Sequence, residues 1–186
     1  ATLLHVKDRW QFAPGWAATV GLHHSRDSYL KRRDTEPRLG LEWQWSEHTL
    51  LSAAWGRHNQ IPPPQQIVPE LGNPRLDHLH ARHLGLGIAQ TLSAGWSWRA
   101  ELYQKRLRDL VVGDATQNYV NGGSGRAHGL ELLLRRDEQP GVPWWGWVSL
   151  SWSQASRRNA LTGETFRFEF DQPPVLMTAY NPPEYR

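Results

Sequence analysis

The sequence has no cysteine, no long apolar run and no sustained helical pattern of apolar residues. Without cysteine the chain has no disulfide framework, no thiolate metal site and no cysteine nucleophile. A membrane-spanning helix needs a run of about 18 apolar residues, and no such run occurs. The opening segment, ATLLHVKDRW, also lacks the basic region and apolar stretch of a signal peptide.

Charge of either sign is modest, which argues against a nucleic-acid partner. The chain has 21 Lys+Arg and 18 Asp+Glu, and all but three of the basic residues are arginine. The arginines are spread along the sequence, whereas nucleic-acid binding favours a clustered basic face with interleaved aromatic residues. The mean hydropathy of −0.65 is typical of a soluble protein. Transmembrane β-strands, however, barely raise this average.

The sequence is rich in apolar residues that alternate with polar residues or glycine. Leu39, Leu41, Trp43 and Trp45 form one such series. Similar alternation occupies residues 16–22, 51–58, 84–92, 96–105, 130–135 and 148–152. Segments of this kind are typical of antiparallel strands with one apolar face. We predict an all-β fold, an antiparallel up-and-down meander of about eight to nine strands, whose last strand begins near Val175.

The predicted connections alternate in length. Short turns are expected at residues 13–15, 46–49, 92–95 and 138–143, and longer polar loops at 25–37, 59–81, 109–125 and 153–174. This alternation is typical of a meander whose two ends differ, with plain turns at one end and elaborate loops at the other.

The apolar face points either into a soluble core, as in a sandwich or lipocalin-like barrel, or outward to lipid. Three features favour lipid: a polar, glycine-rich opposite face, short turns opposite long loops, and tryptophans near strand ends, where membrane barrels carry aromatic girdles. The girdle residues that we predict are Trp16, Trp43, Trp45, Trp96, Trp98, Trp144 and Trp152. The alternative is a soluble, tryptophan-rich carbohydrate-binding β-domain.

Charged residues on the opposite face are expected to line a lumen. These residues are Arg38, Glu42, Arg99, Glu101, Lys105, Glu131 and Arg135. They would either hold a plug domain and guide a substrate or form cross-strand ion pairs that make the lumen polar.

Three segments together resemble the barrel of TonB-dependent outer-membrane receptors. They are YVNGGSGRAHGLELLLRR at residues 119–136, ELGNPRLDHLHARHLGLGI at residues 70–88, and FDQP at residues 170–173. The resemblance extends from about Trp16 to Tyr180 and implies a transmembrane β-barrel in the outer membrane of a Gram-negative cell. It also implies uptake of a ferric siderophore or similar scarce nutrient, powered by the inner-membrane TonB complex acting through a plug.

Family members are several hundred residues long, with a plug domain and 22 strands in the barrel. We therefore expect residues 1–186 to form a single segment of an incomplete barrel, without the plug and the C-terminal strands. The alternative within the membrane is a small self-contained barrel with an anchoring or adhesive role.

No catalytic residue, metal site or cofactor is predicted. Ser149, Ser151 and Ser153 alternate on one face, but no histidine and aspartate are spaced to complete a nucleophile. The resemblance places substrate capture in the long loops, and the ligand-binding candidates there are Arg75, His78, His80, His83, Tyr119 and Asn121. Histidines in a polar loop with only Asp77 as a nearby carboxylate are also consistent with simple solvation.

Overall fold

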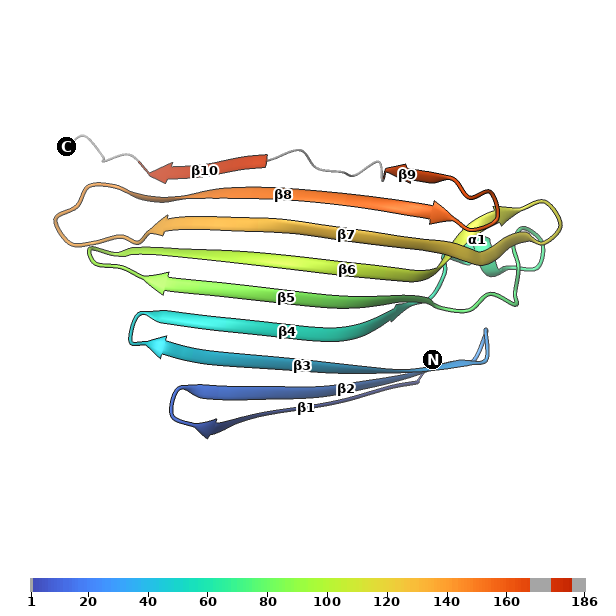
Figure 1. The fold of residues 1–186 in the computed structure, drawn as a ribbon, viewed down its shortest axis with the longest axis horizontal. Helices are drawn as coiled ribbons and strands as arrows, with labels where there is room; N and C mark the ends of the chain where they lie inside the picture. The colour runs from blue at the N-terminus through green and yellow to red at the C-terminus, as the bar shows by residue number, and fades with distance from the viewer. Residues whose placement is uncertain (1, 168–174, 182–186) are drawn as a thin grey trace.

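The computed structural model describes residues 2–167 and 175–181. The chain forms one antiparallel sheet in which each long strand pairs with the next along the sequence (Figure 1). The strands are β1 (Thr2–Ala13), β2 (Trp16–Asp27), β3 (Arg32–Ser46), β4 (Thr49–Gln60), β5 (Leu79–Thr91), β6 (Trp96–Asp114), β7 (Asn118–Arg136), β8 (Trp145–Asn159), β9 (Thr165–Arg167) and β10 (Val175–Asn181). Both β9 and β10 pair with β8. The predicted antiparallel meander is confirmed.

The only helix within the described residues is α1 (Pro64–Ile67), between β4 and β5. No helix in this part of the chain is long and apolar enough to cross a membrane.

The strands are longer, and the loops shorter, than the sequence predicted. The predicted loops at residues 25–37 and 109–125 are wrong, because β2 and β3 are separated only by residues 28–31 and β6 and β7 only by residues 115–117. β1 was not recognised as an alternating segment, since Asp8 interrupts the series Val6, Trp10 and Phe12 on one face of the strand. The predicted FDQP segment lies outside the described residues.

The strand register collects apolar side chains into lateral rows on one face. Ala53, Leu86, Leu102 and Leu130 face one another in order across β4 to β7. Leu86 and Leu102 are 53% and 55% exposed. We call the four rows that contain Trp98, Ile88, Leu86 and Leu84 the apolar band, and the opposite side of the sheet the polar face.

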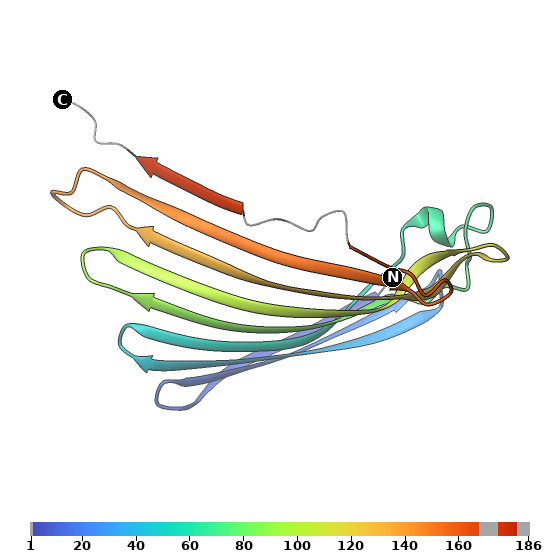
Figure 2. The ribbon, with the colours of Figure 1, turned by 45° about the horizontal axis from the view of Figure 1, so that its top comes forward.

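No second layer covers the apolar band in the part of the chain that the structure describes. Figure 2 shows the sheet curved into an open trough, with α1 and its loop at one end. The accessible surface is 13239 Å², against about 9,100 Å² expected for a compact protein of this mass. A soluble sandwich would bury its apolar face against a second sheet, so the carbohydrate-binding alternative is not supported.

Tryptophans gather at the end of the sheet that carries the short turns. Trp16 stacks on Trp43 with ring centroids 4.9 Å apart, and Trp43 stacks on Trp45 at 6.0 Å. Trp96 meets Trp144 edge-to-face at 5.7 Å. We call this end the turn end and the opposite end the loop end.

Trp152 differs from the other predicted girdle residues, because it pairs with Leu130 in the middle of the apolar band. Trp145 and Trp147 also lie near the turn end, but on the polar face, where Trp147 pairs with Arg135.

The sheet is open at both sides within the described residues. β1 pairs only with β2, all its described side chains are exposed, and β10 pairs only with β8. A self-contained barrel would require these two edges to meet, and they do not pair with each other.

β3 and β4 separate toward the loop end. Their pairing runs from Ser46 and Thr49 to Arg38 and Gly56 and then stops. Beyond this point β3 stays paired with β2 as far as Arg32, while β4 stays paired with β5 as far as Gln60. A gap therefore opens in the sheet on the side where the long loop lies.

Candidate functional site

The loop between β4 and β5, residues 61–78, folds over the loop end of the sheet. Its residues Ile67 and Leu76 are buried together with Leu30 from the β2–β3 turn, and Val111 and Tyr119 pack against them. This small cluster is the hydrophobic core that the described residues form, since both sheet faces are largely uncovered. The loop is therefore held by packing of its own apolar side chains against the β2–β3 turn and the adjoining ends of β6 and β7.

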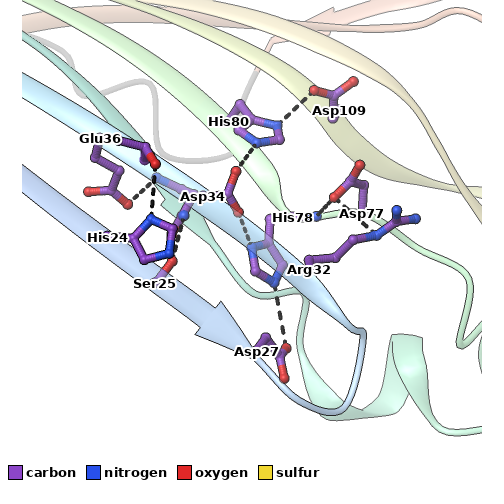
Figure 3. Close-up of polar contacts among 12 residues, drawn as sticks. His24, Ser25, Asp27, Arg32, Asp34, Glu36, Asp77, His78, His80 and Asp109 are labelled. Carbon is purple, nitrogen blue, oxygen red and sulfur yellow. Dashed lines mark hydrogen bonds and ion pairs between the residues drawn. The ribbon is translucent and has the colours of Figure 1, made fainter. Parts of the chain in front are cut away.

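Two histidines and three aspartates link this loop to the sheet in a continuous polar chain (Figure 3). His78 is 1% exposed, and its Nδ1 contacts a carboxylate oxygen of Asp34 while its Nε2 lies 3.5 Å from Oδ2 of Asp27. His80 continues the chain, with Nε2 3.0 Å from Oδ1 of Asp34 and Nδ1 2.9 Å from Oδ2 of Asp109. Asp34 thus bridges two imidazoles.

The charges in this chain reinforce one another. Burial lowers the pKa of His80, but its hydrogen bonds to Asp34 and Asp109 and their charges outweigh that effect, so the pKa lies above 6.5. Burial raises the pKa of Asp34, whereas hydrogen bonds from His80 and His78 lower it more, so the pKa lies below 3.8. Both residues lie beyond the apolar band, toward the loop end. Each residue of the pair therefore favours the charged form of the other.

Local hydrogen bonds shape the end of the loop. The Asn73 side-chain oxygen accepts from the Arg75 N–H at 3.0 Å, and the Asp77 carboxylate accepts from the His78 N–H at 2.8 Å. Short polar side chains that bond to the following backbone are typical of turns. Gly72 is required by space, because a Cβ there would lie 2.2 Å from the Gln66 carbonyl oxygen.

Asn121 of β7 fastens the loop from the other side. Its side-chain oxygen accepts from the Asp77 N–H at 2.7 Å, and its amide group donates to the carbonyls of Asp77 at 3.1 Å and Asp109 at 2.8 Å. Nearby, the Asn73 amide donates to the Tyr119 carbonyl at 2.7 Å. The Asn121 side chain thus joins the loop, β6 and β7 at one point.

The gap between β3 and β4 is bridged by side chains. Glu36 is 4% exposed, accepts from the Asn59 N–H at 2.9 Å and pairs with Arg38 at 2.9 Å. Asn59 also donates to the Ser25 hydroxyl at 3.1 Å. The adjoining cavity of about 210 Å³ includes Asp34, Glu36, His58 and His80 in its lining.

The structure brings five of the six predicted ligand-binding residues to this end. His78, His80, Tyr119 and Asn121 hold the loop in place, and Arg75 is exposed on its surface. His83 is separate: its ring lies 4.3 Å from that of His58, in a hollow of the polar face beside Arg38 and Lys105. The alternative that the loop histidines are simply solvated is wrong for His78, which is buried.

Asp27, Asp34 and Asp109, the carboxylates that hold the histidines, were not predicted. They lie 29 to 51 positions from their histidines, so no local spacing in the sequence marks them. One signal in the sequence could have found them, because each of the three aspartates lies within a predicted long loop, at residues 25–37 or 109–125. Within the described residues no group of three or more acidic, His or Cys side chains is arranged to hold a metal ion.

The predicted lumen residues all belong to the polar face, but few are paired across strands. Glu42 pairs with Arg9 at 2.7 Å, and Arg135 pairs with Asp137 at 2.5 Å. Glu101 and Glu131 face each other directly, which places like charges together. The polar face therefore carries charge that its own side chains do not neutralise.

Comparisons with known proteins agree on the fold. A family model described as TonB dependent receptor-like, beta-barrel, matches residues 1–180. The siderophore receptor PirA of Pseudomonas aeruginosa is 18% identical, with a TM-score of 0.69 over 96% of this chain and 36% of that protein. The outer membrane transporter YddB of Escherichia coli is 16% identical, with a TM-score of 0.73 over 96% of this chain and 30% of that protein.

The FrpB iron transporter of Neisseria meningitidis is similar as well, at 16% identity and a TM-score of 0.65 over 84% of this chain and 26% of that protein. The chain spans only 26% to 36% of the length of these three solved structures. At these identities the likeness concerns the fold.

Proposed function

The chain belongs to the TonB-dependent receptor β-barrel family, and from this premise we propose that it forms part of the wall of an outer-membrane receptor. The family is one of receptors and not of enzymes, in agreement with the sequence prediction. The observation that carries the proposal is the exposed apolar band, which has tryptophans at its turn end and a polar, charged face behind it. Membrane barrels have this arrangement, because lipid contacts one face of each strand and the lumen the other.

The open edges support a larger closed barrel around this sheet. A strand edge in lipid leaves backbone N–H and C=O groups without partners, which costs several kcal/mol for each group. β1 and β10 each pair on one side only within the described residues. We therefore infer that further strands pair with both edges, and that residues 1–186 are a single β-barrel segment.

The proposed substrate is a ferric siderophore or a similar scarce nutrient, captured at the loop end. The similar structure of PirA, which is named as a siderophore receptor, supports this class. Arg75 and Tyr29 are exposed on the packed loop cluster and offer a cation and an aromatic ring to a bulky polar ligand. Lumen charges such as Glu101 and Glu131 would then face a plug, which the TonB complex moves to release the substrate.

The membrane part of the proposal is tested by partition. The chain is refolded with and without phosphatidylcholine vesicles, and its sedimentation and tryptophan emission are measured. Association with vesicles and blue-shifted emission are expected, because the apolar band needs lipid contact. A soluble monomer that unfolds cooperatively in plain buffer would contradict a membrane role.

The substrate part is tested by titrating ferric catecholate and hydroxamate siderophores and following quenching of tryptophan emission. Arg75→Ala is expected to weaken binding of an anionic complex about tenfold, the effect of one charged hydrogen bond of about 1.5 kcal/mol. Arg33→Ala is the matched control, since Arg33 is exposed near the same end but lies on the outward face. Equal affinities for both variants would remove Arg75 from the site.

A further inference from the structure

Four arginines stand side by side on the outward face of the sheet, the same face as the apolar band. Arg57, Arg82, Arg106 and Arg126 occupy four neighbouring strands, β4 to β7. Arg82 pairs in register with both Arg57 and Arg106, and Arg106 pairs with Arg126. We call these four residues the arginine row. It spans about 14 Å, three inter-strand spacings.

The arginine row has no counter-charge of its own. All four side chains are exposed, and none forms an ion pair with a residue that the structure describes. Arg57, Arg82 and Arg106 line the cavity of about 210 Å³ together with Asp34, Glu36 and Asp109. These carboxylates are already engaged by His78, His80, Arg38 and Asn59. Like charges directly opposite one another destabilise a sheet, so the row is suited to anions from outside the chain.

A hollow adjoins the row on the same face. It has a volume of about 420 Å³, and its lining includes Arg106, Arg108, Arg126 and Arg158 together with the hydroxyls of Ser124 and Thr165. No carboxylate among the described residues lines it. Guanidinium groups bind phosphate through paired hydrogen bonds, so the hollow presents a concave surface for phosphate oxygens.

The position of the row relative to the membrane identifies the kind of ligand. Trp96 at the turn end and Arg106 lie ten residues apart on β6, about 33 Å along the strand and about 25 Å across a bilayer for a strand tilted by about 40°. This equals the usual height of the lipid-facing band. The row thus lies where acyl chains end and headgroups begin.

The transition between the two zones is graded. In the row next to the arginines, Leu84 on β5 is followed by Gln104 on β6, His128 on β7 and Gln154 on β8. These side chains offer neutral hydrogen bonds at the depth of ester or sugar groups. An amphiphile is favoured over a free anion, because its chains would cover Leu84, Leu86 and Leu102 while its head meets the arginines.

From these observations we propose that the arginine row and its hollow bind the headgroup of a lipid that carries more than one phosphate, such as the phosphorylated saccharolipid of an outer leaflet. Several phosphates on one rigid sugar head match several cations at spacings of about 5 Å better than a single-phosphate phospholipid does. The site rests on the proposed membrane orientation. It uses other residues than the proposed substrate site, which lies at Arg75 and Tyr29 on the loop cluster.

The test uses the chain in vesicles of phosphatidylcholine that contain either a bis-phosphorylated saccharolipid or phosphatidylglycerol at equal phosphate charge. Insertion is measured by tryptophan emission, and retained lipid by phosphorus content after detergent extraction. The row variant carries Arg82→Gln, Arg106→Gln and Arg126→Gln. Its affinity for the saccharolipid is expected to fall about a hundredfold, since each basic residue near a charged membrane surface contributes about fivefold.

Two matched variants complete the test. Arg9→Gln, Arg99→Gln and Arg135→Gln together remove the same charge from the polar face and are expected to retain the saccharolipid fully. Arg82→Lys, Arg106→Lys and Arg126→Lys together keep the charge and are expected to retain most of the binding. Normal vesicle insertion of the glutamine variant, measured by tryptophan emission, shows that its loss of lipid is not misfolding.

Insertion in all vesicles with equal saccharolipid retention by the row variant would overturn the lipid site and leave the proposed function intact. An equal loss of phosphatidylglycerol would overturn the requirement for several phosphates. Failure of the unmodified chain to insert in any vesicle would overturn both the membrane orientation and the lipid site.

Discussion

At the scale of single residues, His78 occupies the position on which the long loop depends. Its imidazole is almost fully buried between Asp27 and Asp34, and it is the last residue of the loop before β5. His80, two residues further on, repeats the contact from the strand itself. The loop is thus tied to β2, β3 and β6 through carboxylates rather than through backbone pairing.

Replacing His78 with alanine is expected to loosen residues 61–78 while the sheet stays folded. The change leaves Asp27 and Asp34 without one partner, at a cost of about 2 to 3 kcal/mol for a charged buried hydrogen bond. Hydrogen exchange of the loop amides is the measurement, and faster exchange is expected. His48→Ala, in an exposed turn at the turn end, is the control and should leave the loop amides unchanged.

The His80–Asp34 contact gives the loop a pH window. Because the folded pKa of His80 is raised above 6.5, its contribution is complete below 6.5 and is lost as pH rises through the raised value. Because the folded pKa of Asp34 is lowered below 3.8, its contribution is present above 3.8 and is lost as pH falls through the lowered value.

Loop protection from proteolysis is therefore expected to be greatest between about pH 4 and pH 6.5 and to weaken on either side. Asp34→Asn should remove the acid limb of this profile and reduce the other limb, because Asp109 still contacts His80. A profile in Asp34→Asn as steep as that of the unmodified chain would assign the pH dependence to other groups.

The sequence revealed only half of this site. Histidines in DHLHARH stood out because they are crowded, whereas Asp27, Asp34 and Asp109 lie singly in polar segments. Their role depends on the register between β2 and β3 and on the gap beside β4, neither of which a single sequence specifies. The arginine row was missed for a similar reason, since residues 57, 82, 106 and 126 are far apart in the chain and meet only across strands.

At the scale of strands, the alternation of apolar and polar residues was enough to predict which side chains share a face of the sheet. It did not predict where each strand begins and ends. The alternation of apolar residues stops where the apolar band stops. Backbone pairing continues beyond it through polar residues, and Gly113 still pairs with Tyr119 near the tip of β6 and β7. Polar strand extensions look like loops in the sequence. β1 was missed for a different reason, because Asp8 interrupts an otherwise apolar face of the strand.

A pair of substitutions on β6 tests the assignment of its two faces. Leu102→Arg places a charge in the middle of the apolar band and is expected to destabilise the vesicle-bound sheet by about 2 to 4 kcal/mol. Glu101→Arg, the neighbouring residue on the polar face, places a cation opposite Glu131 and should be neutral or stabilising. Denaturant titration in vesicles compares the two, and equal effects would contradict the lipid-facing assignment.

At the scale of the whole molecule, the proposed membrane role requires lipid on one side of the sheet and further strands at its edges. The exposed area, about half as much again as expected for a compact protein of this mass, supports that proposal. From its resemblance to a longer family the sequence predicts an incomplete barrel, and this stays a prediction. The sequence could not indicate the curvature of the trough or the packing of the loop against its end.

Two tryptophans of the sheet are expected to lie at different depths in the bilayer. Trp152 lies in the middle row of the apolar band, and Trp45 is 63% exposed at the turn end. Lipids brominated near the ends of their acyl chains quench tryptophans deep in the bilayer, and Trp152→Phe should remove more of this quenched emission than Trp45→Phe does. Lipids brominated near their headgroups should show the opposite, with the larger loss in Trp45→Phe. The reverse order would mean that the sheet lies at another depth.

The separation of β3 from β4 beyond Arg38 and Gly56 divides the loop end of the sheet into two leaves. One leaf carries Asp34 and Glu36, and the other carries Asn59 and His80. Within the described residues the seam between the leaves is closed only by side chains. Substitution of these side chains would therefore remove the contacts across the seam without breaking any backbone hydrogen bond between paired strands, so the two leaves are joined more weakly here than anywhere along their paired length.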